Sequence, residues 1–159
     1  MSLAEQAQSE MDAAREYFNR STRNLAEAHS GAAPAPGMMT AAQQVAHAAH
    51  TIEWFIDGAF GSKGFDTDFA AQAVRVNACT SLTEARAWFE RAIAGAKRAV
   101  AGRSDAELLA PLPNGPIMGG APRIAVFRGI TDHTAHHRGA LTVYARLSGV
   151  VPPMPYADM

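Results

Sequence analysis

The histidines are the residues of this sequence whose type and spacing could do chemistry. Three of the six lie within five positions near the C-terminus: His133, His136 and His137. At about 100° per residue, His133 and His137 share one helix face among apolar residues, whereas His136 is turned about 100° away. Two imidazoles four residues apart on one face can bind a single metal ion. The alternative is that both are core histidines satisfied by hydrogen bonds.

A metal site on this helix needs a further ligand from elsewhere in the chain. His47 and His50 lie on an earlier predicted helix, and the helical periodicity leaves open which of them faces the interior. Taken alone, each is typical of a surface or boundary histidine. His29 ends the first predicted helix, where an imidazolium interacts favourably with the helix dipole, so we expect a structural role for it.

The elements that must position these histidines are predicted to be helices. Apolar residues recur at three- and four-residue steps, and Gly/Pro-rich segments interrupt the pattern at 31–37 and 110–122. Long helices are expected over residues 3–28, 40 to about 58 or 61, 81–102 and 122–148, with one short helix inside 62–79. Thr40 with Gln43 and Ser81 with Glu84 are predicted capping boxes. The expected fold class is therefore all-α, a four-helix bundle with long Gly/Pro-rich connecting loops.

Composition narrows the function classes. The 159 residues fit one domain spanning 1–159, and the formal net charge of -1 gives no general reason to bind nucleic acid. Cys79 is the single cysteine, so no intrachain disulfide can form. No apolar run is long enough for a membrane span, and the N-terminal residues lack the pattern of a signal peptide. We therefore expect a cytoplasmic protein that does not associate with membranes.

Two segments resemble a known family. The first is HAAHTIEWF at residues 47–55, and the second is DHTAHHRGALTVYARLSGVVPPMPY at residues 132–156. Together they are similar to the DinB/YfiT-like superfamily of small four-helix proteins. The matching residues are His47, Trp54, His133, His137, Arg138, Gly139, Tyr144, Arg146, Gly149, Pro152 and Pro153. Many members have Gln after the Arg-Gly pair, where this chain has Ala140.

The resemblance implies a metal site and a class of activity. It favours His47 over His50 as the third ligand, so that His47, His133 and His137 hold one divalent metal ion, with zinc, nickel or iron all suited to imidazole ligands. Three histidines leave a coordination position open, the pattern of a catalytic site. Some relatives transfer low-molecular-weight thiols such as bacillithiol, mycothiol or glutathione to other molecules, and others are thiol-dependent isomerases. The resemblance also implies a homodimer.

Three function classes follow from these observations. The first is a metal-dependent transferase that joins a low-molecular-weight thiol to an electrophilic small molecule. The second is a non-enzymatic metal-dependent binding or stress-response protein, in which metal ligation serves stability or sensing. The third is a helical interaction module whose histidines are core residues. No carboxylate stands out as a general base, so catalysis would depend on the metal and its bound nucleophile.

Overall fold

The computed structural model describes residues 1–157, and every regular element in that part of the chain is helical. The elements are α1 Leu3–Thr22, a 3₁₀ turn η1 Glu27–His29, α2 Ala41–Phe60, α3 Phe69–Asn77, α4 Leu82–Val100, α5 Asp105–Leu109 and α6 Ala125–Leu147. Residues 1–157 contain no strand, and an isolated bridge joins Pro111 to Pro122. The all-helical expectation is confirmed.

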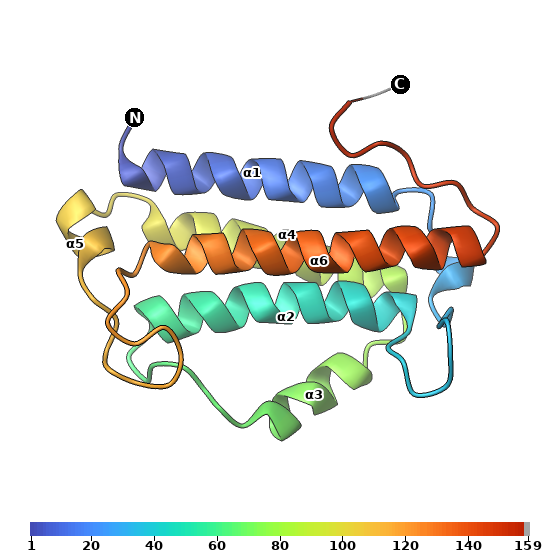
Figure 1. Ribbon diagram of the computed structural model, residues 1–159, viewed down its shortest axis with the longest axis horizontal. Coiled ribbons are helices and arrows are strands. Elements are labelled where there is room, and N and C mark those ends of the chain that lie inside the picture. Colours follow the sequence, from blue (N-terminus) through green and yellow to red (C-terminus); the bar gives the residue numbers. More distant parts are fainter. Residues whose placement is uncertain (158–159) are drawn as a thin grey trace.

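Four long helices, α1, α2, α4 and α6, pack side by side, and the short α3 lies beside α2 on the outer side of this group (Figure 1). α1 and α6 run in the same direction, antiparallel to α2 and α4 (Figure 1). Because α2 and α4 are parallel, the chain must cross the length of the molecule between them. The crossing segment contains α3, the short helix predicted within residues 62–79.

Most of the long helices begin and end at the capping residues and glycines that the sequence predicts. Thr40 and Gln43 form a reciprocal capping box at α2, and Gly61 follows its last residue. At α4, Ser81 Oγ accepts the backbone N–H of Glu84, which is the helix-capping half of the predicted box. Gly149 follows α6 with φ 76°, a left-handed conformation that suits glycine. These ends are set by residues near in sequence.

Two predicted helix boundaries were wrong, and tertiary contacts explain both. The first helix ends at Thr22 rather than near residue 28, because the Arg86 guanidinium on α4 donates to the carbonyls of Thr22 and Leu25. α6 begins at Ala125 rather than at 122, because the N–H groups of residues 125–127 bond carbonyls only three residues back, which makes residues 122–124 a turn. This turn is held in place by backbone bonds from residues 123 and 124 to the carbonyls of Ala110 and Leu108. The short helix α5 was not predicted; its N-cap is Ser104.

The core lies between the four long helices and is tightest where residues are small. Six alanines of α2 are fully buried: Ala41, Ala42, Ala46, Ala48, Ala49 and Ala59. On α6, a Cβ at Gly129 would lie 2.8 Å from the Phe55 ring of α2, so glycine is what allows these two helices to approach at that level. Phe18 of α1 stacks on Phe89 of α4, with ring centroids 4.3 Å apart.

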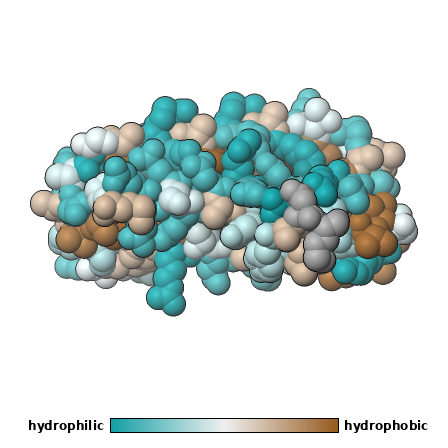
Figure 2. Space-filling model, turned by 90° about the horizontal axis from the view of Figure 1, so that it is seen from above, coloured by the Kyte–Doolittle hydropathy of each residue, from teal (hydrophilic) through white to brown (hydrophobic). Residues whose placement is uncertain are grey.

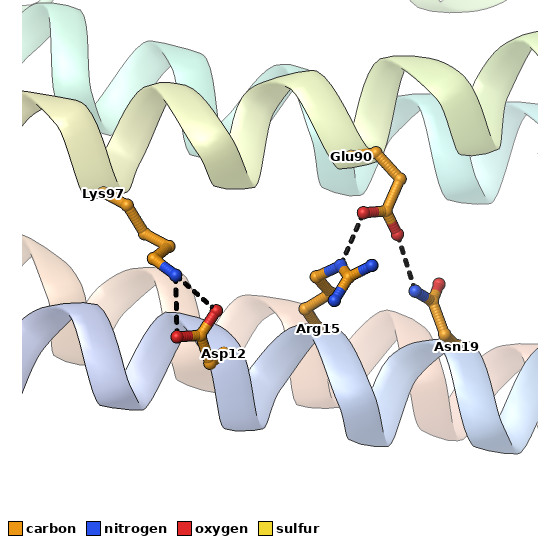
Figure 3. Close-up of polar contacts among 5 residues, drawn as sticks. All are labelled: Asp12, Arg15, Asn19, Glu90 and Lys97. Carbon is orange, nitrogen blue, oxygen red and sulfur yellow. Dashed lines mark hydrogen bonds and ion pairs between the residues drawn. The ribbon is translucent and has the colours of Figure 1, made fainter.

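Polar contacts between α1 and α4 lie outside this core. Lys97 bonds both carboxylate oxygens of Asp12, and Glu90 accepts from Arg15 and Asn19 (Figure 3). The face seen from the α1 side is mostly hydrophilic, with hydrophobic patches toward its two ends (Figure 2). None of the helices within residues 1–157 is long and apolar enough to cross a membrane.

Candidate metal centre

His133 and His137 lie one turn apart on the face of α6 that packs against α2. Their Nε2 atoms are 3.2 Å apart, and their ring centroids are 4.4 Å apart. His137 is buried, with 7% of its surface exposed, and His133 is partly buried. The helical periodicity thus brings the two rings together, as the i and i+4 spacing predicts.

His47 comes from α2 and completes a cluster of three. Its ring centroid lies 5.0 Å from that of His133 and 4.8 Å from that of His137. One nitrogen from each of the three rings lies within 4.8 Å of the other two. Because α2 and α6 are antiparallel, later residues of α2 meet earlier residues of α6: Gln44 contacts Tyr144 and His137, and Phe55 packs at Gly129. His47, between Gln44 and Phe55, therefore lies at the level of the histidine pair.

The protonation state of His137 follows from a chain of hydrogen bonds behind it. The Met39 carbonyl can only accept, so the Tyr144 hydroxyl donates to it, at 2.7 Å. The Tyr144 oxygen therefore accepts from Gln44 Nε2, at 3.2 Å. Gln44 Oε1 then faces His137 Nδ1, at 2.5 Å, and must accept an N–H from it. His137 consequently carries its proton on Nδ1 and presents the lone pair of Nε2 to the cluster.

Burial keeps all three rings neutral near pH 7. Burial, and after it the charges of the neighbouring histidines, lower the pKa of His137 to about 3 and that of His133 to about 4. The pKa of His47 is also lowered, first by burial and then by the charges of His50 and His136. Metal ligation needs neutral imidazole, so the cluster holds its ligands in the form that binds an ion.

The donor set fits a metal ion that prefers imidazole nitrogen. Two nitrogens bound about 2.0–2.1 Å from a tetrahedral zinc ion lie roughly 3.3 Å apart, close to the 3.2 Å between His133 Nε2 and His137 Nε2. No carboxylate or cysteine among the described residues joins the three-histidine group. Such a set leaves at least one position of a tetrahedral ion open to water or another ligand.

The remaining histidines lie outside this group. The His50 ring contacts Trp88 of α4 edge-on, with centroids 6.1 Å apart, rather than the pair on α6. His136 touches the His137 ring perpendicularly and is exposed. His29 lies in η1, where its Nδ1 accepts the backbone N–H of Ala26, consistent with a structural role.

Two polar residues of the family-like motif act away from the metal group. The Arg138 guanidinium lies over the rings of Tyr17 and Tyr156, at 5.7 and 5.5 Å from their centroids. Trp54 donates its indole N–H to the carbonyl of Asp66, in the segment that precedes α3. Neither residue contacts the histidines, so neither belongs to the candidate metal group.

Gln44 is the residue of the site that sequence reasoning missed. It is buried, with 9% of its surface exposed, and lies three residues before His47 on the same side of α2. This spacing is a signal that could have suggested a role beside His47, but a single polar residue in an alanine-rich helix is not by itself distinctive. Its partner His137 is 93 residues away in the sequence.

A small cavity opens beside His47. It has a volume of about 130 Å³ and is lined by Met39, His47, His50, Phe69, Gln72, Ala73, Val76 and Asn77. A second cavity of about 130 Å³ shares His50 and Gln72 with it. The histidine cluster is therefore approached from the side of α3, through a mainly apolar opening.

Removing the acceptor behind His137 should weaken metal binding without changing its stoichiometry. Gln44→Leu leaves the Nδ1–H of His137 without its partner, and loss of such a contact costs about tenfold to a hundredfold in metal affinity. Gln44→Glu keeps an oxygen that accepts this N–H, so its metal affinity should equal or exceed that of the parent. Calorimetric metal titration measures both variants. Equal affinity in parent and Gln44→Leu would contradict the role assigned to Gln44.

Comparisons with known proteins agree with this architecture. The family model of the DinB superfamily matches residues 10–141, a range that includes all three clustered histidines. The crystal structure of a DinB-like protein from Bacillus cereus ATCC 10987 superposes with a TM-score of 0.74 at 18% identity, covering 94% of this chain and 95% of that one. At this identity the likeness concerns the fold. No curated protein sequence matches the chain.

Proposed function

This chain belongs to the DinB superfamily, and on that premise we propose that it is a metal-dependent transferase. His47, His133 and His137 hold one divalent ion, zinc, nickel or iron, and the reaction joins a low-molecular-weight thiol to an electrophilic small molecule. The observation that carries the proposal is the convergence of three neutral histidines from two antiparallel helices, with two Nε2 atoms 3.2 Å apart. Burying such a group without a shared partner would be costly.

The chemistry that a divalent ion supplies at such a site is to lower the pKa of a bound thiol, so that the sulfur reacts as a thiolate. In the transfer, a carbon–sulfur bond forms to the electrophile. With a haloarene the carbon–halogen bond breaks and halide leaves, while the thiol proton passes to solvent. With an epoxide a carbon–oxygen bond breaks and the oxygen takes up a proton.

The chain's own side chains have distinct tasks in this proposal. The pair on α6 and His47 on α2 form the ligand set, and Gln44 orients His137 through its Nδ1–H. Phe69, Val76 and Met39 line the cavity beside His47 and suit the apolar part of an electrophile. The exclusion of water by these groups strengthens the electrostatic effect of the metal on the thiol.

Metal content and thiol consumption test the proposal together. The protein, purified without an affinity tag, should contain or take up about one divalent ion per chain, measured by elemental analysis. Glutathione, bacillithiol and mycothiol are then offered separately with a haloarene or an epoxide, and thiol loss is followed with and without chelator. We expect chelator-sensitive consumption of at least one thiol, and none in a His133→Ala control.

The other outcomes separate the alternatives. One ion per chain with no consumption of any of the three thiols would favour a non-enzymatic metal-dependent binding or stress-response protein. No uptake of zinc, nickel, manganese or iron(II) would overturn the metal site and favour a helical module with core histidines. Assembly into a homodimer also remains a prediction, and light scattering at micromolar concentration measures it.

A further inference from the structure

A larger cavity lies between α1 and α6 and involves none of the three clustered histidines. Its volume is about 530 Å³, within the range of small-molecule sites. Ala13, Ala14 and Ala135 leave the space that larger side chains would fill, and Tyr17, Arg128 and Arg138 are among the side chains around it. We call it the α1/α6 cavity.

The C-terminal segment covers one side of this cavity and is held in place by α1 and by the residues that follow it. Arg20 donates to the carbonyl of Pro155, at 2.7 Å, and Asn24 donates to the carbonyl of Val151, at 3.0 Å. Tyr156 thereby lies against Tyr17, with ring centroids 5.1 Å apart and planes at 77°. The two tyrosines form an aromatic wall whose position is set before any ligand arrives.

The charges around the cavity favour an anion. The Arg128 side chain has no hydrogen-bond or ion-pair partner among residues 1–157, and Arg138 uses one donor, to the Tyr156 hydroxyl at 3.3 Å. The single carboxylate in the lining is Glu10, which is partly exposed and accepts from Gln6. Two guanidinium groups therefore face one carboxylate, and guanidinium donors match the geometry of carboxylate and sulfonate oxygens.

A buried hydroxyl adds a second observation. Thr134 lines the cavity with 3% of its surface exposed, and its hydroxyl has no hydrogen-bond partner among the described residues. Buried polar atoms in native proteins are nearly always hydrogen-bonded, so this one needs explanation. A polar group of a ligand at this wall would supply the missing partner.

We propose that the α1/α6 cavity binds a small organic anion, a carboxylate or sulfonate carried on an apolar ring. The ring packs on the alanines and the tyrosine wall, and the anionic group bonds Arg128 and Arg138. This site is separate from the metal centre, and the proposal holds whether or not the metal function does.

Matched ligands of one shape and different charge test it. Calorimetric titration with 2-naphthoate or naphthalene-2-sulfonate should show binding that the neutral 2-naphthamide lacks. Arg128→Gln and Arg138→Gln should each lower the affinity for the anions by about tenfold or more, the usual effect of losing a hydrogen bond to a charged group. Glu10→Gln should raise the affinity for both anions, because it removes a negative charge that repels them. Arg146→Gln is the control, since Arg146 lies on α6 outside the cavity.

The proposal is overturned if neither anion binds, if the amide binds equally well, or if both arginine variants keep the parent's affinity. The titration is repeated in a His133→Ala background, because a carboxylate can also bind a metal ion. Unchanged anion affinity there supports the α1/α6 cavity. Loss of binding in that background would place the anion at the histidines instead and overturn the proposal. Circular dichroism establishes that each variant is folded.

Discussion

We expect His47→Ala, His133→Ala and His137→Ala each to remove most metal binding. Each variant reduces the set of three nitrogens, which lie within 4.8 Å of one another, to two. No carboxylate or cysteine among the described residues lies in this group to replace the missing ligand. Because the ion is held by the set as a whole, the loss should exceed the tenfold to hundredfold expected for Gln44→Leu. Calorimetric titration with zinc, nickel and iron(II) measures affinity and stoichiometry for each variant.

His50→Ala and His136→Ala are the matched controls. His50 faces Trp88, and His136 is exposed beside His137, so both variants should bind one ion per chain like the parent. A diffuse histidine patch would instead lose affinity modestly with any of the five changes. If His50→Ala abolished binding while His47→Ala did not, the assignment of the ligand on α2 would be wrong.

Phe89→Ala should have the largest effect on stability among the changes considered. Phe89 is 1% exposed and stacks on the fully buried Phe18, so truncation leaves a cavity between α1 and α4. Phe-to-Ala changes in cores cost about 3–5 kcal/mol. For a chain of this size each kcal/mol lowers Tm by about 2–4 °C, so a fall of roughly 10 °C is expected. Thermal unfolding is measured with chelator present, because bound metal would stabilise the folded state.

The ion pairs between α1 and α4 should contribute much less to stability than the stacked rings of Phe18 and Phe89. Lys97 bonds Asp12 on the outside of the α1–α4 contact (Figure 3), and the Asp12 side chain is 55% exposed. Exposed pairs of this kind contribute about 0–1 kcal/mol. Lys97→Ala should therefore change the free energy of unfolding several-fold less than Phe89→Ala. Similar losses in the two variants would mean that the polar surface, rather than the stacked rings, holds these helices together.

The local features of this protein can be predicted from residues that are close together in the sequence. The four-residue spacing of His133 and His137 was enough to predict a shared helix face, because helical geometry depends only on neighbouring residues. The capping residues Thr40 and Ser81 marked two helix starts for the same reason. The all-helical fold followed from the apolar periodicity and the Gly/Pro-rich breaks between helices.

The meeting of His47 with the histidine pair of α6 depends on how the helices pack. α2 contacts α4, α6 and α3, and its buried alanines lie on an arc that includes neither His47 nor His50, so the apolar pattern does not mark either histidine as the one that faces α6. Helical periodicity could therefore not choose between His47 and His50, and the choice rested on a family resemblance. The packing of α2 against α6 sets His47 4.8 Å from the ring of His137 and turns His50 toward Trp88. Gln44 escaped prediction for the same reason, since its partner lies on another helix and their contact arises only when the two helices pack.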